Sequence, residues 1–289
     1  MADGHDLGSC AARRRGSSPR FPTNRICWFS IHPTFVKVKA IPTNKVETYR
    51  RTLQQLDNWE PYLLAESGLP GPRGNLELAQ AVFEEGDAAL FERFLEYTPD
   101  KAPVNSPEEF LHFCGVFGQG RHLSRDSHST WGRLRQYAGD PRWRTREAVA
   151  MGLQAFGDRD MDGLLSEMEV WSRGSRFQQR AAAAGLCEPR LLKQESHAAT
   201  VLHVIDIITS SIVSAGDRRD EGSKVLRQAL GYCWSVAVVT LPPDGKLLME
   251  KWFVSADPDI RRIMKNNLTK NRLFKMDGAW VERWRQELK

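Results

Sequence analysis

Beyond residue 46 the sequence is a succession of segments in which apolar residues recur at helical spacing, divided by short turns of Gly, Pro, Asp and Ser. No run of residues alternates between polar and apolar in the way that a half-buried strand requires. The segments predicted to be helical include 46–64, 76–83, 88–97, 107–117, 142–156, 161–171, 177–186, 197–214, 222–239, 247–253 and 259–268. The sequence therefore predicts an all-α domain over residues 46–289, which is long enough to bury a substantial core.

Two of these helices carry clear start signals. Ser106 is followed by Pro107 and then by Glu109 at the third position after the serine, which is the arrangement of a capping box. Asp257 similarly precedes a proline at the start of the last of these helices. We therefore expect the side chains of Ser106 and Asp257 to cap the helices that follow them.

Internal repeats relate several of the helices. The pattern Trp-x-x-Arg-x-Ala-x-Ala at positions 143–150 returns as Phe-x-x-Arg-x-Ala-x-Ala at 177–184. A second match, at a longer and constant offset, pairs Glu169, Trp171 and Arg180 with Glu250, Trp252 and Arg261. Such repeats are typical of stacked helical hairpins, because each hairpin hides one apolar face and needs a neighbour to cover the rest.

The runs Asp-Pro-Arg-Trp-Arg-Thr-Arg-Glu-Ala-Val-Ala at 140–150 and Asp-Pro-Asp-Ile-Arg at 257–261 resemble the Asp-Pro-x-Val-Arg-x-x-Ala signature of HEAT repeats. The domain over 46–289 also resembles bacterial HEAT-repeat proteins of the armadillo-type superfamily, among them relatives of the helical-repeat alkylpurine DNA glycosylases. The resemblance implies an α-α superhelix, a curved right-handed solenoid with a concave surface. It also implies a structural ladder between repeats, formed here by Asp140, Arg146, Arg180, Asp257 and Arg261.

Two functions fit this interpretation. Stacked hairpins present extended surfaces, and the chain contains no histidine pair with metal-ligand spacing and no Gly-rich phosphate loop after a strand. We therefore expect a non-enzymatic scaffold, without a cofactor, for a protein or nucleic-acid partner. The alternative implied by the resemblance is a DNA alkylation repair-like protein of the alkylpurine DNA glycosylase type, which binds or excises alkylated bases.

A glycosylase of that type uses Trp-x-x-x-Asp on one helix, and this pattern does not occur in the chain. The nearest counterpart is Trp143 with Glu147, which a helix places on one face. Glu147 also lies inside the repeat signature, where a ladder or surface carboxylate is the simpler interpretation. The sequence therefore supports the predicted fold better than it supports a catalytic role for Trp143 and Glu147.

One segment matches a metal-binding pattern. Residues 158–169 follow the calcium-loop arrangement of carboxylates at positions 1, 3, 5 and 12 with glycine at position 6. The carboxylates are Asp158, Asp160, Asp162 and Glu169. However, the preceding helix carries its apolar residues where one face of a solenoid requires them, and no second loop is present to pair with the first. We interpret the segment as a polar turn that caps the helix beginning at Met161.

The formal net charge is +5, and its distribution is more informative than the sum. Residues 1–45 carry a net charge of +6, so the rest of the chain sums to −1. Segments 121–147 and 256–275 each carry +4, whereas 75–100 carries −6. If the basic helices line one groove they would follow a phosphate backbone, and if they alternate in direction they are ordinary solvated faces. The candidate binding residues are Arg135, Arg262, Lys265, Lys270 and Arg272.

Residues 1–45 lack the unbroken apolar centre of a secretory signal, and we expect them to be a disordered or spurious extension. Five widely spaced cysteines without a Cys-x-x-Cys pair fit a reducing cytoplasm rather than a disulfide framework or zinc site. The mean hydropathy is −0.48, and no uninterrupted apolar stretch approaches the roughly 18 residues of a membrane span. We therefore expect a cytoplasmic monomer that does not contact a membrane.

Overall fold

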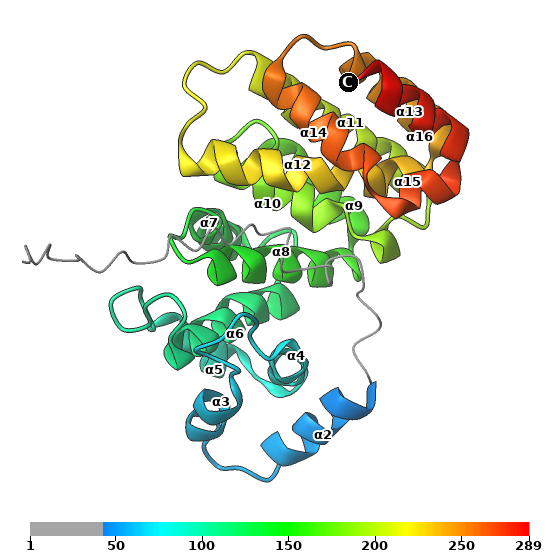
Figure 1. The fold of residues 1–289 in the computed structure, drawn as a ribbon. Coiled ribbons are helices and arrows are strands. Elements are labelled where there is room, and N and C mark those ends of the chain that lie inside the picture. The colour runs from blue at the N-terminus through cyan, green and yellow to red at the C-terminus, as the bar shows by residue number, and fades with distance from the viewer. Residues whose placement is uncertain (1–42, 289) are drawn as a thin grey trace, which may run out of the picture. The chain divides into compact units, whose positions relative to one another are not determined.

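The computed structural model describes residues 43–288, and the regular elements within that range are helices (Figure 1). They are fifteen α-helices and one short 3₁₀-helix, and the described range contains no strand, so the all-α prediction is confirmed. The elements are α2 (Thr43–Leu53), α3 (Glu60–Glu66), α4 (Leu76–Glu85), α5 (Ala88–Leu95), α6 (Pro107–His122), α7 (His128–Tyr137), α8 (Trp143–Gly157), α9 (Met161–Trp171), α10 (Arg176–Leu186), η2 (Pro189–Leu191), α11 (Glu195–Val213), α12 (Glu221–Thr240), α13 (Pro242–Phe253), α14 (Pro258–Leu268), α15 (Asn271–Met276) and α16 (Gly278–Glu287). The extension predicted over 1–45 lies outside the described residues except at its end, where α2 begins at Thr43.

The helix predicted over 46–64 is divided into α2 and α3, so that part of the prediction is wrong. Pro61 lies in the first turn of α3, where its missing N–H costs nothing. In the interior of a longer helix its ring would crowd the carbonyl four residues earlier and break the helix. The helices α7, α15 and α16 were not among the predicted segments.

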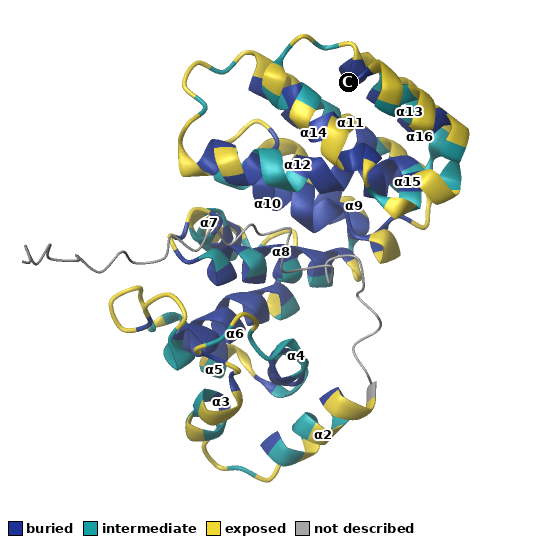
Figure 2. Ribbon diagram, in the orientation of Figure 1, coloured by how far each residue is buried: buried dark blue, intermediate teal, exposed yellow. Residues whose placement is uncertain are grey.

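Six helices form a central row in which each contacts the next, namely α4, α6, α8, α10, α12 and α14. The helices α5, α7, α9, α11 and α13 connect them along the chain and pack beside the row (Figure 1). A helix inside the row has a neighbour on either side and a flanking helix against it, so little of its surface reaches water. Figure 2 shows this as nearly continuous burial along α6 and α8.

Two glycines bring α6 and α8 together. A Cβ atom on Gly120 of α6 would lie 2.4 Å from the carbonyl oxygen of Gly152 of α8. A larger residue at position 120 would separate the two backbones, so glycine is required there for packing. Phe117 of α6 also stacks on Phe83 of α4, with 4.4 Å between ring centroids.

Three carboxylates join helices outside the central row, and all three bind the same two kinds of group. Each accepts a hydrogen bond from an indole N–H and pairs with a cation. The groups are Glu167 with Trp171 and Arg135, Asp206 with Trp252 and Lys251, and Glu250 with Trp280 and Arg283. These tryptophans are buried at their apolar end and fixed at their polar end, which makes them packing residues of the fold.

Among the described helices, α11 is long and apolar enough to span a membrane by length and composition, with a mean hydropathy of 1.4. Its apolar residues are interrupted by polar ones, so the helix is no uninterrupted apolar stretch. Its apolar face, which includes Val201, Ile205 and Ile208, is buried against neighbouring helices. Its exposed face carries polar residues such as His203 and Ser210. The helix therefore has the pattern of a core helix with one solvated side.

Candidate binding surfaces

The accessible positions of α8 recur every four residues. Trp143, Glu147, Met151 and Ala155 are partly exposed, and every other residue of this helix is buried. The Glu147 carboxylate accepts a hydrogen bond from Arg180 of α10 at 2.7 Å, and the two side chains are 12% and 7% exposed. An indole, a carboxylate and a guanidinium therefore lie together along one narrow stripe.

The same arginine links two repeats of the sequence. Arg180 donates to the backbone carbonyl of Arg146 at 2.9 Å, and Arg146 donates to the backbone carbonyl of Asp140 at 2.7 Å. The Asp140 carboxylate is held instead by Arg142, which binds both of its oxygens. The ladder residues thus connect successive turns largely through backbone carbonyls, to which a planar guanidinium can donate from several directions.

At the other end of the central row, Asp257 caps α14 by accepting hydrogen bonds from the backbone N–H groups of Asp259 and Ile260. Its carboxylate also pairs with Arg218 at 2.6 Å. Arg261 donates to the carbonyl of Leu288, at the end of α16, at 3.3 Å. The expected cap is therefore present, while Arg261 links α14 to α16 rather than to a turn carboxylate.

The capping box expected at Ser106 does not form. The Ser106 hydroxyl is buried and has no hydrogen-bond partner among the described residues. Glu109 is fully buried, and its Oε2 accepts from the N–H of Asn105 at 2.7 Å and from Arg144 of α8 at 2.9 Å. Because this carboxylate serves an arginine on another helix, it does not complete the reciprocal pair with Ser106.

Every arginine of segment 121–147 is engaged within the fold. Carboxylates hold five of them, in the pairs Arg125 with Asp160, Arg133 with Glu92, Arg135 with Glu167, Arg142 with Asp140, and Arg144 with Glu109. Arg121 and Arg146 donate to backbone carbonyls, and Arg146 also lies 4.0 Å from the Glu221 carboxylate. Arg135 lies over Trp171 in the flanking layer, so the structure does not bring this predicted binding residue to Arg262 or Lys265.

Arg262 and Lys265 are exposed on the last helix of the central row, α14. Their spacing of i, i+3 places them on one face of the helix. Neither has a hydrogen-bonding or ion-pair partner in the described part of the chain. The next residue, Asn266, packs against Gly231 of α12, which places this face of α14 beside the middle of α12.

Lys270 and Arg272 come together over Tyr232 of α12. The guanidinium carbon of Arg272 is 4.6 Å from the ring centroid, and its Nη2 donates to the Tyr232 hydroxyl at 2.5 Å. Lys270 Nζ is 6.0 Å from the same centroid. We call Arg262, Lys265, Lys270 and Arg272 the α14–α15 basic surface. Sequence reasoning missed Tyr232, which no motif marks and which is distant from Arg272 along the chain.

The four carboxylates of the calcium-loop match have separate partners. They pair Asp158 with Arg190, Asp160 with Arg125, Asp162 with His197, and Glu169 with Arg173. Asp160 caps α9 by accepting from the Gly163 N–H at 2.9 Å, and its hydrogen bonds from Arg125 lower its pKa to about 2. Within residues 43–288, no three His, Cys, Asp or Glu side chains gather as metal ligands. The segment is built as a capping turn.

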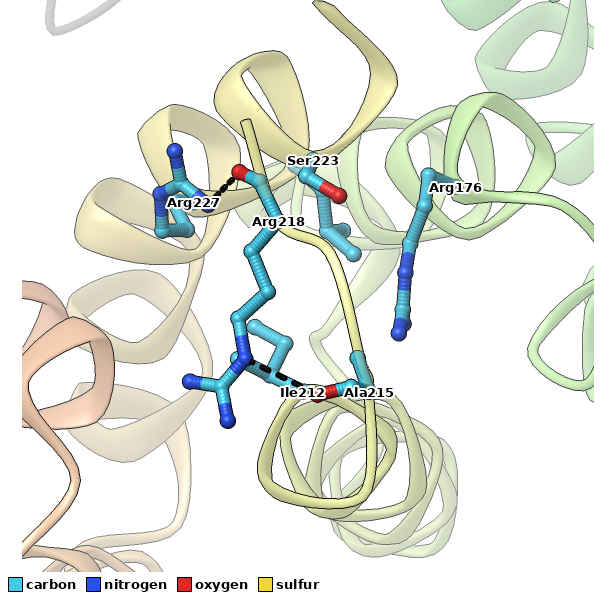
Figure 3. A pocket seen from close by; sticks show the side chains of 7 residues that line it. Arg176, Ile212, Ala215, Arg218, Ser223 and Arg227 are labelled. Carbon is cyan, nitrogen blue, oxygen red and sulfur yellow. Dashed lines mark hydrogen bonds between the residues drawn. The ribbon is translucent and has the colours of Figure 1, made fainter. Parts of the chain in front are cut away.

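A small hollow between α10, α11 and α12 is lined by Arg176, Arg218 and Arg227 (Figure 3). Their guanidinium groups are already used: Arg176 donates to Ser211 Oγ at 2.7 Å, and Arg227 donates to the carbonyl of Arg218 at 2.8 Å. Arg218 pairs with Asp257. The hollow has no room for a water molecule, so it is a polar joint between helices rather than a ligand site.

Two pairs of sequence-predicted residues thus lie close together, Trp143 with Glu147 on α8, and Lys270 with Arg272 over Tyr232, while Arg262 and Lys265 share one face of α14. No protein-family model, curated protein or solved structure matches the chain. Any function therefore has to be argued from the chemistry of these two surfaces.

Proposed function

We propose that this chain is a non-enzymatic scaffold of stacked, HEAT-type helical hairpins that binds nucleic acid through the α14–α15 basic surface. The serial contacts from α4 to α14 and the arginine links between repeats support a superhelical arrangement. The observation that carries the function is the exposed pair Arg262 and Lys265, which has no partner in the described residues while the arginines of 121–147 are all engaged.

Exposed cations on one helix face suit a polyanion because each phosphate that they neutralise releases condensed counterions. Lys270 and Arg272 follow shortly after Lys265 and extend the same positive region onto α15. The free, buried thiols of Cys114, Cys187 and Cys233 support a reducing compartment such as the cytoplasm.

The test is fluorescence anisotropy with a labelled duplex DNA at several salt concentrations. We expect the logarithm of the binding constant to fall with the logarithm of salt by about 0.9 for each phosphate contact. The double variant Arg262→Glu/Lys265→Glu should lose about two units of this slope and at least about tenfold in affinity at low salt.

The matched control is Lys101→Glu/Lys193→Glu, which makes the same change in net charge at two exposed lysines outside the basic surface. It should bind DNA as the unmodified chain does. Equal losses in the two double variants would show that binding follows total charge rather than this surface. A chain that binds neither duplex nor single-stranded DNA or RNA would overturn the proposal.

The α8 stripe favours a second candidate, a DNA alkylation repair-like protein. Trp143 could stack on a base, and Glu147 could stabilise the positive charge that develops on a departing nucleoside. Both side chains are partly accessible and one turn apart. The absence of Trp-x-x-x-Asp and the ion pair between Glu147 and Arg180 are the reasons for placing this candidate second.

Incubation with a methylated duplex, followed by mass spectrometry of the released bases, tests this second function. If it holds, a methylated purine is released and Glu147→Gln abolishes the release, whereas Glu169→Gln, at an exposed carboxylate of α9, leaves the rate unchanged. No release from any alkylated duplex would remove the enzymatic interpretation.

A further inference from the structure

Two cysteines meet at the contact between α10 and α12. Cys187 ends α10, and its backbone N–H donates to the carbonyl of Ala183 at 3.0 Å. The thiol of Cys233, in the middle of α12, donates to the same Ala183 carbonyl at 3.4 Å. One carbonyl oxygen therefore holds the backbone of one cysteine and the sulfur of the other, although the two residues belong to different helices.

The electrostatics of the two side chains agree with this geometry. Cys233 is the largest cause of the raised pKa of the Cys187 thiol, ahead of burial, and only a side chain in close contact acts so strongly. Burial alone raises the pKa of Cys114, the third thiol of the described residues, which lies on α6. Cys187 and Cys233 are thus a pair of adjacent thiols, and Cys114 provides a reference for them.

A small oxidant can approach this pair from the end of α10. Cys187 and Cys233 are 4% and 3% exposed, and both are free thiols. The turn after Cys187 is open to solvent at Pro189 and Arg190. Only the thiolate reacts with oxidants, and the raised pKa of Cys187 keeps its thiolate fraction small. The pair therefore reacts slowly, and with a molecule little larger than water rather than with a bulky reagent.

We propose that Cys187 and Cys233 are a redox-active pair that hydrogen peroxide closes into an intramolecular disulfide. First, the Cys187 thiolate attacks a peroxide oxygen and the O–O bond breaks. Cys187 becomes a sulfenic acid, and the released hydroxide takes up the proton that the thiol lost and leaves as water. Next, the Cys233 sulfur attacks the Cys187 sulfur, the S–S bond forms and the S–O bond breaks. The hydroxyl leaves as water with the Cys233 proton, so two thiols lose two electrons and one peroxide becomes two waters.

The disulfide is a reversible clamp between two helices of the central row. It closes a loop that contains η2 and α11, and closing a loop of this length restricts the unfolded chain. The oxidised chain is therefore more resistant to unfolding than the reduced chain. Thiol reductants of a reducing compartment reopen the pair by thiol–disulfide exchange, so the thiols are the resting state.

The bond can be located by peptide mapping. The full chain is incubated with hydrogen peroxide, its remaining thiols are alkylated, and it is digested with trypsin without reduction. Trypsin releases Cys187 in peptide 181–190 and Cys233 in peptide 228–246. Mass spectrometry should find these two peptides joined, two hydrogen atoms lighter than their sum, and dithiothreitol should separate them. Thiols that stay alkylatable, sulfinic acids without a link, or a link from either residue to another cysteine would overturn the proposal.

A melting experiment followed by circular dichroism tests the clamp. Oxidation should raise the melting temperature of the unmodified chain by about 10 °C, and dithiothreitol should remove the gain. Cys233→Ala should show no gain, whereas Cys114→Ala, the same change at another buried cysteine, should keep it. Each variant is compared with its own reduced form, so a cavity left by the substitution does not affect the result. A Cys233→Ala chain that gains as much as the unmodified chain would assign the effect to a different bond and overturn the proposal.

Discussion

Residues 121–147 and 256–275 carry the same net charge of +4, and the fold uses them in opposite ways. In the first segment Arg142 and Arg144 are buried with carboxylate partners, and the remaining arginines are engaged as well. In the second segment Arg262 and Lys265 are exposed to solvent. Net charge along the chain therefore does not locate a binding surface by itself.

The residue types explain much of the difference. All seven cations of 121–147 are arginines, whereas three of the six in 256–275 are lysines. A guanidinium is planar, weakly hydrated and able to bind carboxylates and several carbonyls at once, so it can connect helices inside a fold. A lysine ammonium is strongly hydrated and tends to stay at the surface. An all-arginine basic segment is thus a sign of internal connections, and a mixed one is a better sign of an open surface.

The largest predicted effect comes from a substitution that removes a buried ion pair of the first segment. Arg144→Met removes the partner of Glu109, whose side chain is completely buried. Leaving that charge unpaired should lower the free energy of unfolding by about 3–5 kcal/mol, or prevent folding. Urea denaturation followed by circular dichroism measures this loss.

The double variant Arg144→Met/Glu109→Leu controls for the change in packing. With both charges gone, most of the lost stability should return, because an apolar pair of similar volume can replace a buried ion pair. A double variant as unstable as Arg144→Met would mean that packing, rather than charge, dominates at this contact.

Acid should lower the stability of the fold through His112 of α6, which is buried beside Arg142 of the first segment. Its ring lies edge-on to Tyr137, neither nitrogen has a hydrogen-bond partner in the described residues, and burial beside Arg142 lowers its pKa to about 4. Between pH 6.5 and about 4 the unfolded chain binds a proton at this residue and the folded chain does not. The free energy of unfolding should therefore fall by about 3 kcal/mol across that window and then level off.

This contribution can be isolated with His112→Leu, which has no ring to protonate. The variant should lack this part of the pH dependence when unfolding is measured at pH 7 and pH 4. The segment 256–275 provides the contrast: Arg262→Gln should keep the acid sensitivity of the unmodified chain. If His112→Leu loses as much stability in acid as the unmodified chain does, the charging group is a different one.

The sequence was enough to predict the helices of the central row, because their apolar spacing and their caps are local properties. Asp257 caps α14 where its proline predicts a helix start. Ser106 and Glu109 match a capping box equally clearly, but the Glu109 carboxylate accepts a hydrogen bond from Arg144, which is distant along the chain. The candidate surface at Tyr232 was missed for the same reason, since a contact between distant parts of the chain leaves no trace in local spacing.

An intermediate effect is expected at Glu250, which anchors the helices next to the second segment. Its carboxylate accepts from the indole N–H of Trp280 at 2.6 Å and of Trp284 at 3.3 Å. Glu250→Ala leaves these partly buried donors unsatisfied and should cost about 1–3 kcal/mol. Urea unfolding followed by tryptophan fluorescence reports the change. A neutral result would mean that α16 is held by its apolar contacts alone.

The smallest effect should come from the two exposed cations themselves. Arg262→Gln/Lys265→Gln removes no contact within the described fold and should change the free energy of unfolding by no more than about 0.5 kcal/mol. Urea denaturation beside Arg144→Met gives the comparison directly. A loss of more than about 1 kcal/mol would exceed what free surface residues contribute and would mean that Arg262 and Lys265 also act as connectors. Near-neutral stability combined with weakened DNA binding would show that the second segment is retained for its surface, since the fold does not need these charges.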